Sequence, residues 1–471
     1  MRAWPILLLA LCLTACARET APAVASGSAS RAAVDVRVVR DGDRWTAELS
    51  FDRAAPAWVF TRSALARTDQ KPWRPRSWTV ETPGVRLERR GWFDLLVADG
   101  GPVPRKVKVR FTPFAGDLLA DYDPALVFSD GSVALFSQQF DAFPIESASA
   151  AETLPVDLAG AKVTETRMRV TFRDKAGEVL HEGRRRDSVT LEGEGTYVLF
   201  GPATPIVSDS MSTIIDPQLP PWLRTALARS TPAILERYRS ALGPPPGAKP
   251  TIMVSWAGPT KGVTSMGGSV LPGLVVMTFE GDGVLEEDAD LRGRGQWFIA
   301  HEAAHFWLGQ AVRYEYSRDA WITEGGADLL AIRTVAAIDP AYDWKSELQA
   351  SIDDCAKLSA GRGVASAQER NEHRAYYACG ALFALIAESA SGRPFTHFVR
   401  GLIESNRDDG VIKRAEWLAA LDEASADPSL SADIGRLLDN GAADPMAAIA
   451  SLLARAKVPH RIEPDGRIRL T

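Results

Sequence analysis

The chain has 471 residues, of which 46% are hydrophobic and 24% are charged, and its formal net charge is −6. A chain of this length can bury ample core and is expected to form two or three domains. The mild negative charge offers no concentrated basic face, so nucleic acid is not expected as a partner.

The first residues have the pattern of a secretory targeting segment. Arg2 gives a positive start, and the apolar run from Pro5 to Leu13 is too short for a permanent membrane helix. The Leu-Thr-Ala-Cys stretch that ends at Cys16 resembles the bacterial lipobox, whose cysteine is lipidated and becomes the first mature residue. The alternative is an ordinary cleaved signal peptide with a chance cysteine.

We therefore assign residues 1–15 to a signal peptide and residues 16–32, which are rich in alanine and serine, to a flexible tether. The lipobox comparison implies a lipid anchor at Cys16. By the sorting rule of Gram-negative lipoproteins, the absence of aspartate after that cysteine favours the outer membrane. The protein is expected on the periplasmic face of the bacterial envelope.

The cysteines fit this location. Cys12 is removed with the signal peptide and Cys16 takes the lipid, which leaves Cys355 and Cys379 as a pair in an oxidising compartment. A disulfide between them is predicted. The alternative is two buried free thiols.

Residues 33–205 are predicted to form a β-rich N-terminal domain. Apolar and polar residues alternate in several short runs, and Asp41-Gly42 is one of the turn signals between them. Short strands with frequent turns favour an antiparallel sandwich or saddle. No catalytic constellation stands out in this part. The predicted strands are 34–38, 45–49, 106–111, 167–172 and 196–200.

Beyond residue 220 the pattern changes to helical spacing. A helix over 220–242 is followed by a strand over 251–256 and by a glycine-punctuated, then strand-like segment over 266–279. The acidic stretch 280–290 is expected to be a solvated connection, so Glu280 should lie beyond the strand. A nearly all-apolar segment from about Gln296 to Val312 then predicts a helix that is buried on most sides.

Residues 301–305 of that helix read His-Glu-Ala-Ala-His. Two imidazoles four residues apart share one helix face and form half of a tetrahedral zinc site. Glu324, in a second predicted helix that begins near Trp321, offers a third ligand and leaves the fourth position open for water. Two histidines and Glu302 on a buried helix would be costly unless they are coordinated to a metal or hydrogen-bonded, and this cost favours a metal. The alternative is a chance motif, which is less plausible in a chain with only six histidines.

The motif, followed after eighteen residues by Glu324 within Trp-Ile-Thr-Glu-Gly, resembles the gluzincin zinc metallopeptidases. The nearest pattern is that of the alanyl-aminopeptidase and leukotriene-hydrolase family, with the glycyl aminopeptidases more distant. The resemblance implies one zinc ion per chain, held by His301, His305 and Glu324, with Glu302 as the general base.

The same resemblance implies an α+β multidomain fold. In it, the β-rich domain precedes a thermolysin-like catalytic domain, placed at residues 206–405, and a helical C-terminal region at 406–471. From residue 343 onward, the spacing of apolar residues predicts helices over 344–358, 372–389, 395–404, 414–424 and 446–456. A hairpin is expected over 460–470.

The family also has a tyrosine followed after one residue by Lys-Gly. Tyr377 and Gly380 match that pattern, with Cys379 in place of the lysine. The resemblance implies that Tyr377 stabilises the oxyanion, and the alternative is plain core packing. Asp328 lies one turn after Glu324 and is the candidate to accept the second N–H of a ligand histidine; the alternative is a surface aspartate.

The family's substrate-anchoring stretch, Gly-x-Met-Glu-Asn, has its nearest counterpart here at Gly267, Gly268, Ser269 and Val270, where no glutamate is present. In gluzincins an edge strand before the zinc helix pairs with the substrate backbone, and these residues are assigned to that role. We expect hydrolysis not to require a free N-terminus strictly. The competing view is that another acidic residue anchors the amine.

The sequence thus predicts a zinc-dependent peptidase that acts on a peptide or protein substrate. Two alternatives stay open. One is a zinc hydrolase that acts on other bonds. The other is a binding or scaffold lipoprotein with a retired site, which the missing anchor glutamate and Cys379 favour. The sequence does not define the substrate, the chain end attacked or the oligomeric state.

Overall fold

The computed structural model describes residues 33–471 except 120, 157, 159–160, 248 and 426. The predicted signal peptide, tether and lipidated Cys16 lie outside the described residues. The chain divides into two compact units. Unit 1 holds the described residues up to Val207, together with Ser212–Leu219 and Pro250–Gly283, and unit 2 holds Ser208–Met211, Pro220–Lys249 and Val284–Thr471.

Unit 1 is built mainly from β-sheets. The strands of one sheet follow the order β14-β11-β1-β2-β7-β4, and β1 (Val34–Asp41) pairs antiparallel with β2 (Arg44–Phe51). Alternate residues of β1 and β7 (Lys106–Phe111) are buried, which is the pattern that predicted these strands. The remaining strands of this sheet are β4 (Trp78–Val80), β11 (Met168–Asp174) and β14 (Val189–Glu192).

Further sheets of unit 1 complete its core. One has the order β10-β3-β6-β5 and another β13-β12-β15-β9-β8. Their strands are β3 (Ala57–Phe60), β5 (Val85–Arg90), β6 (Phe93–Ala98), β8 (Ala125–Val127), β9 (Val133–Phe136), β10 (Ala142–Ile145), β12 (Val179–His181), β13 (Arg184–Arg186) and β15 (Tyr197–Phe200).

A sheet with the order β16-β17-β18-β20-β19 also belongs to unit 1. The segment predicted as strand-like is a hairpin of β19 (Ser265–Leu271) and β20 (Leu274–Glu280), in which β19 is the outermost strand. The prediction that Glu280 lies beyond the strand was wrong, because Glu280 ends β20 and pairs with Ser265. The other strands are β16 (Ile206–Val207), β17 (Ser212–Ile215) and β18 (Thr251–Trp256).

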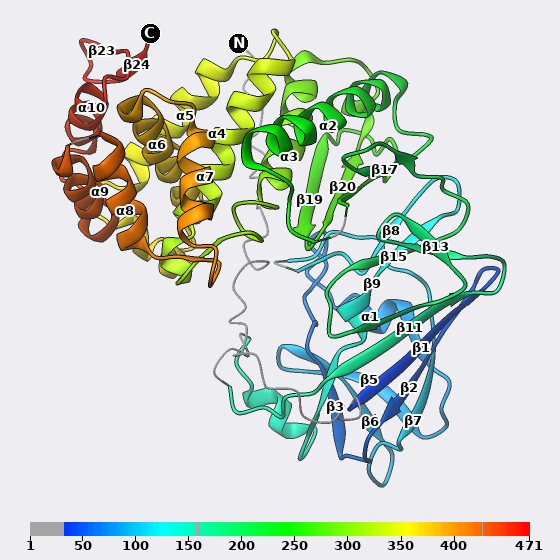
Figure 1. Cartoon of the computed structure of the whole chain (residues 1–471). Coiled ribbons are helices and arrows are strands. Elements are labelled where there is room, and N and C mark those ends of the chain that lie inside the picture. Colours follow the sequence, from blue (N-terminus) through cyan, green and yellow to red (C-terminus); the bar gives the residue numbers. More distant parts are fainter. Residues whose placement is uncertain (1–32, 120, 157, 159–160, 248, 426) are drawn as a thin grey trace. The chain divides into compact units, whose positions relative to one another are not determined.

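Unit 2 is mainly helical. Helices α4 (Trp321–Ile338), α5 (Trp344–Leu358) and α6 (Arg374–Ser391) pack side by side (Figure 1). The tail forms the predicted hairpin, with β23 (His460–Ile462) antiparallel to β24 (Ile468–Leu470). The other helices are α2 (Pro221–Leu242), α3 (Ala289–Ala304), α7 (Phe395–Ser405), α8 (Arg414–Ser425), α9 (Pro428–Asn440) and α10 (Pro445–Arg455).

Helix α9 was not predicted from the sequence. Its buried residues Leu430, Ile434, Leu437 and Leu438 have helical spacing, and the Asp427 side chain caps it by accepting a hydrogen bond from the Ser429 N–H. The signal was therefore present, but a proline at the first helical position and scattered polar residues obscured it.

Helix α3 differs from the predicted Gln296–Val312 at both ends. It begins at Ala289, because the Asp288 carboxylate caps it by accepting a hydrogen bond from the Leu291 N–H at 2.7 Å. It ends at Ala304, where the N–H of His305 turns back to the Glu302 carbonyl at 3.2 Å. This tightening ends the helix, although the apolar pattern continues.

The compact units do not follow the boundaries predicted at 205/206 and 405/406. Strands β17 to β20 group with the β-rich unit, and helices on both sides of residue 405 belong to one helical unit. The predicted fold class, α+β with a sheet-rich N-terminal region and a helical C-terminal region, is confirmed.

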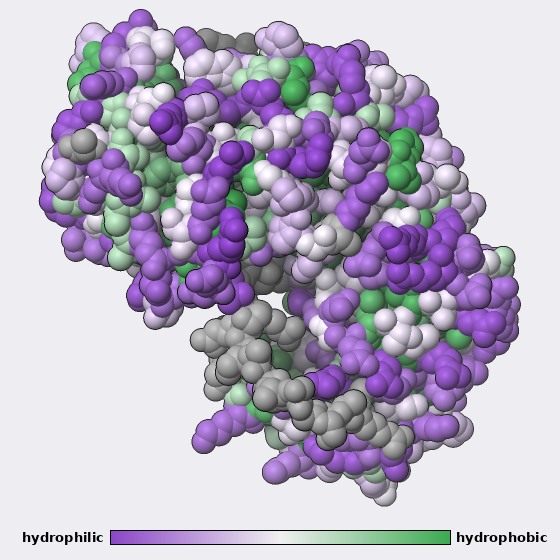
Figure 2. All heavy atoms as spheres, viewed as in Figure 1, coloured by the Kyte–Doolittle hydropathy of each residue, from purple (hydrophilic) through white to green (hydrophobic). Residues whose placement is uncertain are grey.

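Hydrophilic residues cover much of the face shown in Figure 2, and apolar residues appear there in small patches. Among the helices of residues 33–471 that the structure describes, none is both long and apolar enough to cross a membrane.

The core of unit 1 contains a fully buried ion pair. Arg74 donates to Asp94 at 2.8 Å, and neither side chain is exposed. Burial lowers the pKa of Arg74, and the charge of Asp94 works against that shift. Arg74 also donates to the carbonyls of Arg62 and Gln139.

We expect Asp94→Asn to lower the free energy of unfolding by about 3–5 kcal/mol, because it leaves a buried guanidinium without its counter-charge. The matched control is Asp99→Asn, which breaks a surface pair with Arg86 whose aspartate is 71% exposed. Its cost should stay below about 1 kcal/mol. Urea unfolding of both variants measures the difference, and equal costs would contradict a stabilising role of the buried pair.

Candidate metal centre

Three helices of unit 2 carry the side chains that the sequence singled out. His301 and Glu302 lie in the last turn of α3, and His305 caps its C-terminal end. Glu324 lies in the first turn of α4, and Tyr377 in the first turn of α6. All five side chains are buried.

The two histidines and Glu324 point at one another. His301 Nε2 and His305 Nε2 are 3.1 Å apart, and Glu324 Oε2 lies 3.5 Å from the first and 3.4 Å from the second. Ligand atoms about 2.1 Å from a common tetrahedral centre are separated by about 3.4 Å. The three atoms therefore fit a single metal ion, and they form a His/Glu cluster that could hold one.

The outer nitrogen of each ring lies close to an oxygen atom. His301 Nδ1 lies 2.8 Å from Asp328 Oδ1, and His305 Nδ1 lies 2.8 Å from the Leu308 carbonyl. Each Nδ1 that carries the proton leaves the lone pair of Nε2 free for a metal. Asp328 thus lies next to His301, and its predicted role stays a prediction. The Leu308 carbonyl was not predicted, because it depends on the turn that follows α3.

The electrostatics of the cluster favour a positive charge at its centre. Burial lowers the pKa of His301, but interactions with Asp328 and Glu324, together with the charge of Glu302, outweigh burial and raise this pKa to about 10. Burial would raise the pKa of Glu324, yet the charges and hydrogen bonds of the two histidines lower it. A divalent cation bound at the centre would supply such a positive charge.

Glu302 is not part of the three-ligand cluster. Burial raises the pKa of its carboxyl group, and the charges of His301 and His305 oppose this shift. Glu302 is therefore a buried carboxylate beside the ligands and a stronger base than an exposed glutamate.

Of the two adjacent tyrosines at the start of α6, Tyr377 faces the cluster. Its ring stacks on His301 with centroids 5.7 Å apart. Burial raises the pKa of Tyr377 well above its usual value, and the carboxylates of Glu324 and Glu302 raise it further. The Tyr376 hydroxyl instead donates to the Ala365 carbonyl at 3.2 Å.

Trp297 is a neighbour of the cluster that sequence reasoning treated only as part of the apolar helix. It lies one turn before His301 on α3, and its ring centroid is 5.4 Å from that of His301. The four-residue spacing on a helix was the signal that could have indicated this contact.

The predicted substrate-binding residues Gly267, Gly268, Ser269 and Val270 all lie in β19 of unit 1. The Val270 carbonyl accepts a hydrogen bond from the Tyr122 hydroxyl at 3.3 Å. Their predicted role stays a prediction.

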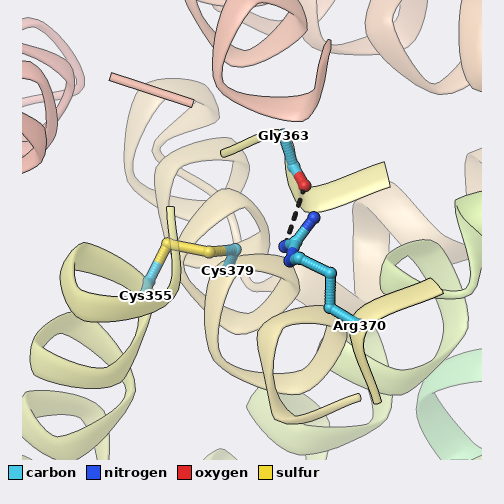
Figure 3. Close-up of a disulfide and its surroundings, with 4 residues drawn as sticks. All are labelled: Cys355, Gly363, Arg370 and Cys379. Atoms are coloured by element: carbon cyan, nitrogen blue, oxygen red, sulfur yellow. Dashed lines mark hydrogen bonds between the residues drawn. A yellow bond between two sulfur atoms is a disulfide. The ribbon is translucent and has the colours of Figure 1, made fainter. Parts of the chain in front are cut away.

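Cys355 and Cys379 form the predicted disulfide, which joins α5 to α6 (Figure 3). Both cysteines are fully buried.

Solved structures show which known fold this is. An aminopeptidase N family protein from Idiomarina loihiensis is similar over 89% of this chain and 78% of its own, with 12% identity and a TM-score of 0.60. The chain has the fold of that protein. At this identity the likeness shows the fold alone.

Two other solved structures are similar at lower TM-scores. Leukotriene A4 hydrolase from Saccharomyces cerevisiae has 12% identity, coverage of 88% of this chain and 68% of its own, and a TM-score of 0.48. An M1 zinc metallopeptidase from Deinococcus radiodurans has 16% identity, coverage of 87% and 92%, and a TM-score of 0.43. No family model and no curated protein matches the chain.

The contact between Asp328 and His301 predicts an effect on metal affinity. We expect Asp328→Asn to weaken zinc binding about 10–100-fold, because the amide orients the ring less well and makes it less basic. Competition with a chromophoric chelator measures the affinity. The matched control is Asp439→Asn, whose carboxylate pairs with Arg414 at 2.6 Å. Equal affinities of Asp328→Asn and the unmodified protein would remove Asp328 from the metal centre.

Proposed function

We propose that the chain is a zinc-dependent metallopeptidase whose metal is held by His301, His305 and Glu324. The supporting observation is the convergence of His301 Nε2, His305 Nε2 and Glu324 Oε2 at the mutual distances of ligands to one ion. Three protein ligands leave a position for water, which is the catalytic arrangement. The similarity of the fold to an aminopeptidase N family protein also supports this function.

Glu302 and Tyr377 have complementary roles in this proposal. A bound zinc ion would supply a water of lowered pKa and would polarise the scissile carbonyl. Glu302 takes the proton from the attacking water and passes it to the leaving amine. Because burial and nearby carboxylates raise the pKa of Tyr377, its phenol stays protonated and donates a hydrogen bond to the oxyanion.

The retired-site alternative loses one of its two arguments. Cys379, which departs from the lysine of the family pattern, has a partner in Cys355, so a structural role accounts for it. A zinc hydrolase of other bonds remains the second candidate. A broad peptide screen that fails on zinc-loaded protein would favour it.

We also propose, from the sequence pattern at Cys16, a lipid anchor in the outer membrane with the protein facing the periplasm. The disulfide supports an oxidising compartment.

Substitution of the base tests the proposed reaction. Purified mature protein should bind one zinc ion per chain, and Glu302→Gln should keep that zinc while the rate of peptide hydrolysis falls by about 10²–10⁴-fold. Glu324→Gln is the control that should lose zinc as well as activity. Metal analysis and peptide kinetics give both readouts. Zinc loss in Glu302→Gln would show that the base and the ligands are misassigned.

The absence of the anchor glutamate predicts how the enzyme treats the N-terminus of its substrate. A charged amine in a desolvated cleft needs a carboxylate partner, and residues 267–271 contain none. The later Glu280 carboxylate already accepts a hydrogen bond from the Thr260 hydroxyl at 2.6 Å. We therefore expect matched peptides with free and acetylated N-termini to be cleaved at similar rates.

Mass spectrometry of the products separates this hypothesis from its competitor. If acetylation abolishes cleavage while the free peptide loses single residues from its N-terminus, another acidic residue binds the amine and the enzyme is an aminopeptidase.

A further inference from the structure

Three residues within one turn of α6 connect it to three other helices of unit 2. Tyr377 stacks on His301 of α3, Cys379 is bonded to Cys355 of α5, and Gly380 lies against α4. The residue proposed to stabilise the oxyanion is therefore two positions from a covalent cross-link and three from a close helix contact.

The contact between α4 and α6 leaves no space for a side chain. A Cβ atom on Gly380 would lie 2.3 Å from the Trp321 carbonyl oxygen, and one on Gly325 would lie 2.1 Å from the Gly380 carbonyl carbon. The two backbones touch one residue after the proposed ligand Glu324. This contact fixes how close α6 can come to the metal centre.

A contact between two glycines fixes the distance between two helices, but it does not by itself prevent them from sliding or rotating. Helices normally resist sliding and rotation because their side chains interdigitate as ridges and grooves. At Gly325 and Gly380 there are no side chains to interdigitate, so this contact sets the separation of α4 and α6. Restraint along the axis of α6 comes from other pairs of the two helices, the Arg333–Glu388 ion pair at 2.9 Å and the Trp321–Phe383 ring contact.

The disulfide supplies a restraint from a second direction. It ties α6 to α5 at Cys379, and an ion pair from Arg374 to Asp354, at 2.9 Å, joins the same two helices close by. The connection between α5 and α6 is itself held, because Arg370 donates to the Gly363 carbonyl at 3.1 Å (Figure 3).

We propose that the Cys355–Cys379 disulfide positions the Tyr377 hydroxyl for the oxyanion, so that both cysteines are positioning residues. This inference rests on the proposed function, in which Tyr377 is the donor. The position of the hydroxyl matters for the rate, because a displacement of about 1 Å in a catalytic group can lower the rate about 100-fold.

A double-mutant cycle on the zinc-loaded protein tests the inference. Tyr377→Phe in the unmodified background should lower kcat about 100-fold with little change in KM, because one oxyanion donor is lost. In the disulfide-free background, Cys355→Ala with Cys379→Ala, kcat should already be reduced, and adding Tyr377→Phe should cost less than about tenfold. Zinc content should stay at one ion per chain throughout.

A merely structural disulfide gives a different result. The melting temperature of the disulfide-free variant would fall, but Tyr377→Phe would cost the same factor in both backgrounds, and that outcome overturns the positioning role alone. If Tyr377→Phe changes nothing while the disulfide is intact, the proposed role of Tyr377 fails, and the inference fails with it.

Two further variants control the cycle. Arg370→Ala removes the hydrogen bonds of Arg370 to Gly363, Ser366 and Glu372 but leaves the disulfide, so the full effect of Tyr377→Phe should persist. A smaller effect would assign the positioning to the connection between α5 and α6 and overturn the role of the disulfide. If the double alanine variant fails to fold, Cys355→Ser alone takes its place. This single substitution breaks the disulfide, leaves Cys379 unchanged and removes little side-chain volume at residue 355.

Hydrogen exchange gives a readout that is independent of activity. Amides of residues 375–381 in the metal-free disulfide-free variant should exchange faster than in the metal-free unmodified protein, while those of α3 should not. Unchanged exchange in 375–381 would contradict the inference.

Discussion

The structure of unit 2 depends on the burial of polar side chains inside apolar helices. The imidazoles of His301 and His305 and the carboxylates of Glu302, Glu324 and Asp328 are all buried. A charge removed from water costs several kcal/mol unless a partner compensates for it. The partners come from different helices, so α3 and α4 must meet in one register for the cluster to be tolerated. The packing of α3 against α4 lowers the cost of burying these charges, and it also brings the three metal ligands together.

The features of this cluster that were predictable from the sequence are those fixed by one helix. His301 and His305 share a face because they are four residues apart, and Asp328 follows Glu324 by the same interval. The end of α3 was not predictable in this way. It depends on the turn that brings the Leu308 carbonyl to His305, and apolar periodicity continues through that turn. The position of Tyr377 came from a family resemblance and not from spacing.

The β-rich unit shows the same limit. Alternation identified β1 as a strand, but it contains no information on which strands become its neighbours. One neighbour is β2, the next strand in the chain, and the other is the distant β11, with which β1 pairs in parallel. Contacts between distant segments also decide that β17 to β20 group with the N-terminal unit. Local pattern predicts elements, and long-range packing decides how they are grouped.

Cys379 shows how a departure from a family pattern can be interpreted. From the sequence alone it supported two opposite conclusions, a disulfide and a retired site. The structure gives it a covalent partner, and the adjacent Gly380 keeps the close contact with Trp321 and Gly325 of α4. The disulfide therefore lies one residue from the close backbone contact between α4 and α6 and two residues from Tyr377. Loss of the lysine therefore need not weaken the site, because the cysteine in its place adds a restraint that a lysine side chain cannot provide.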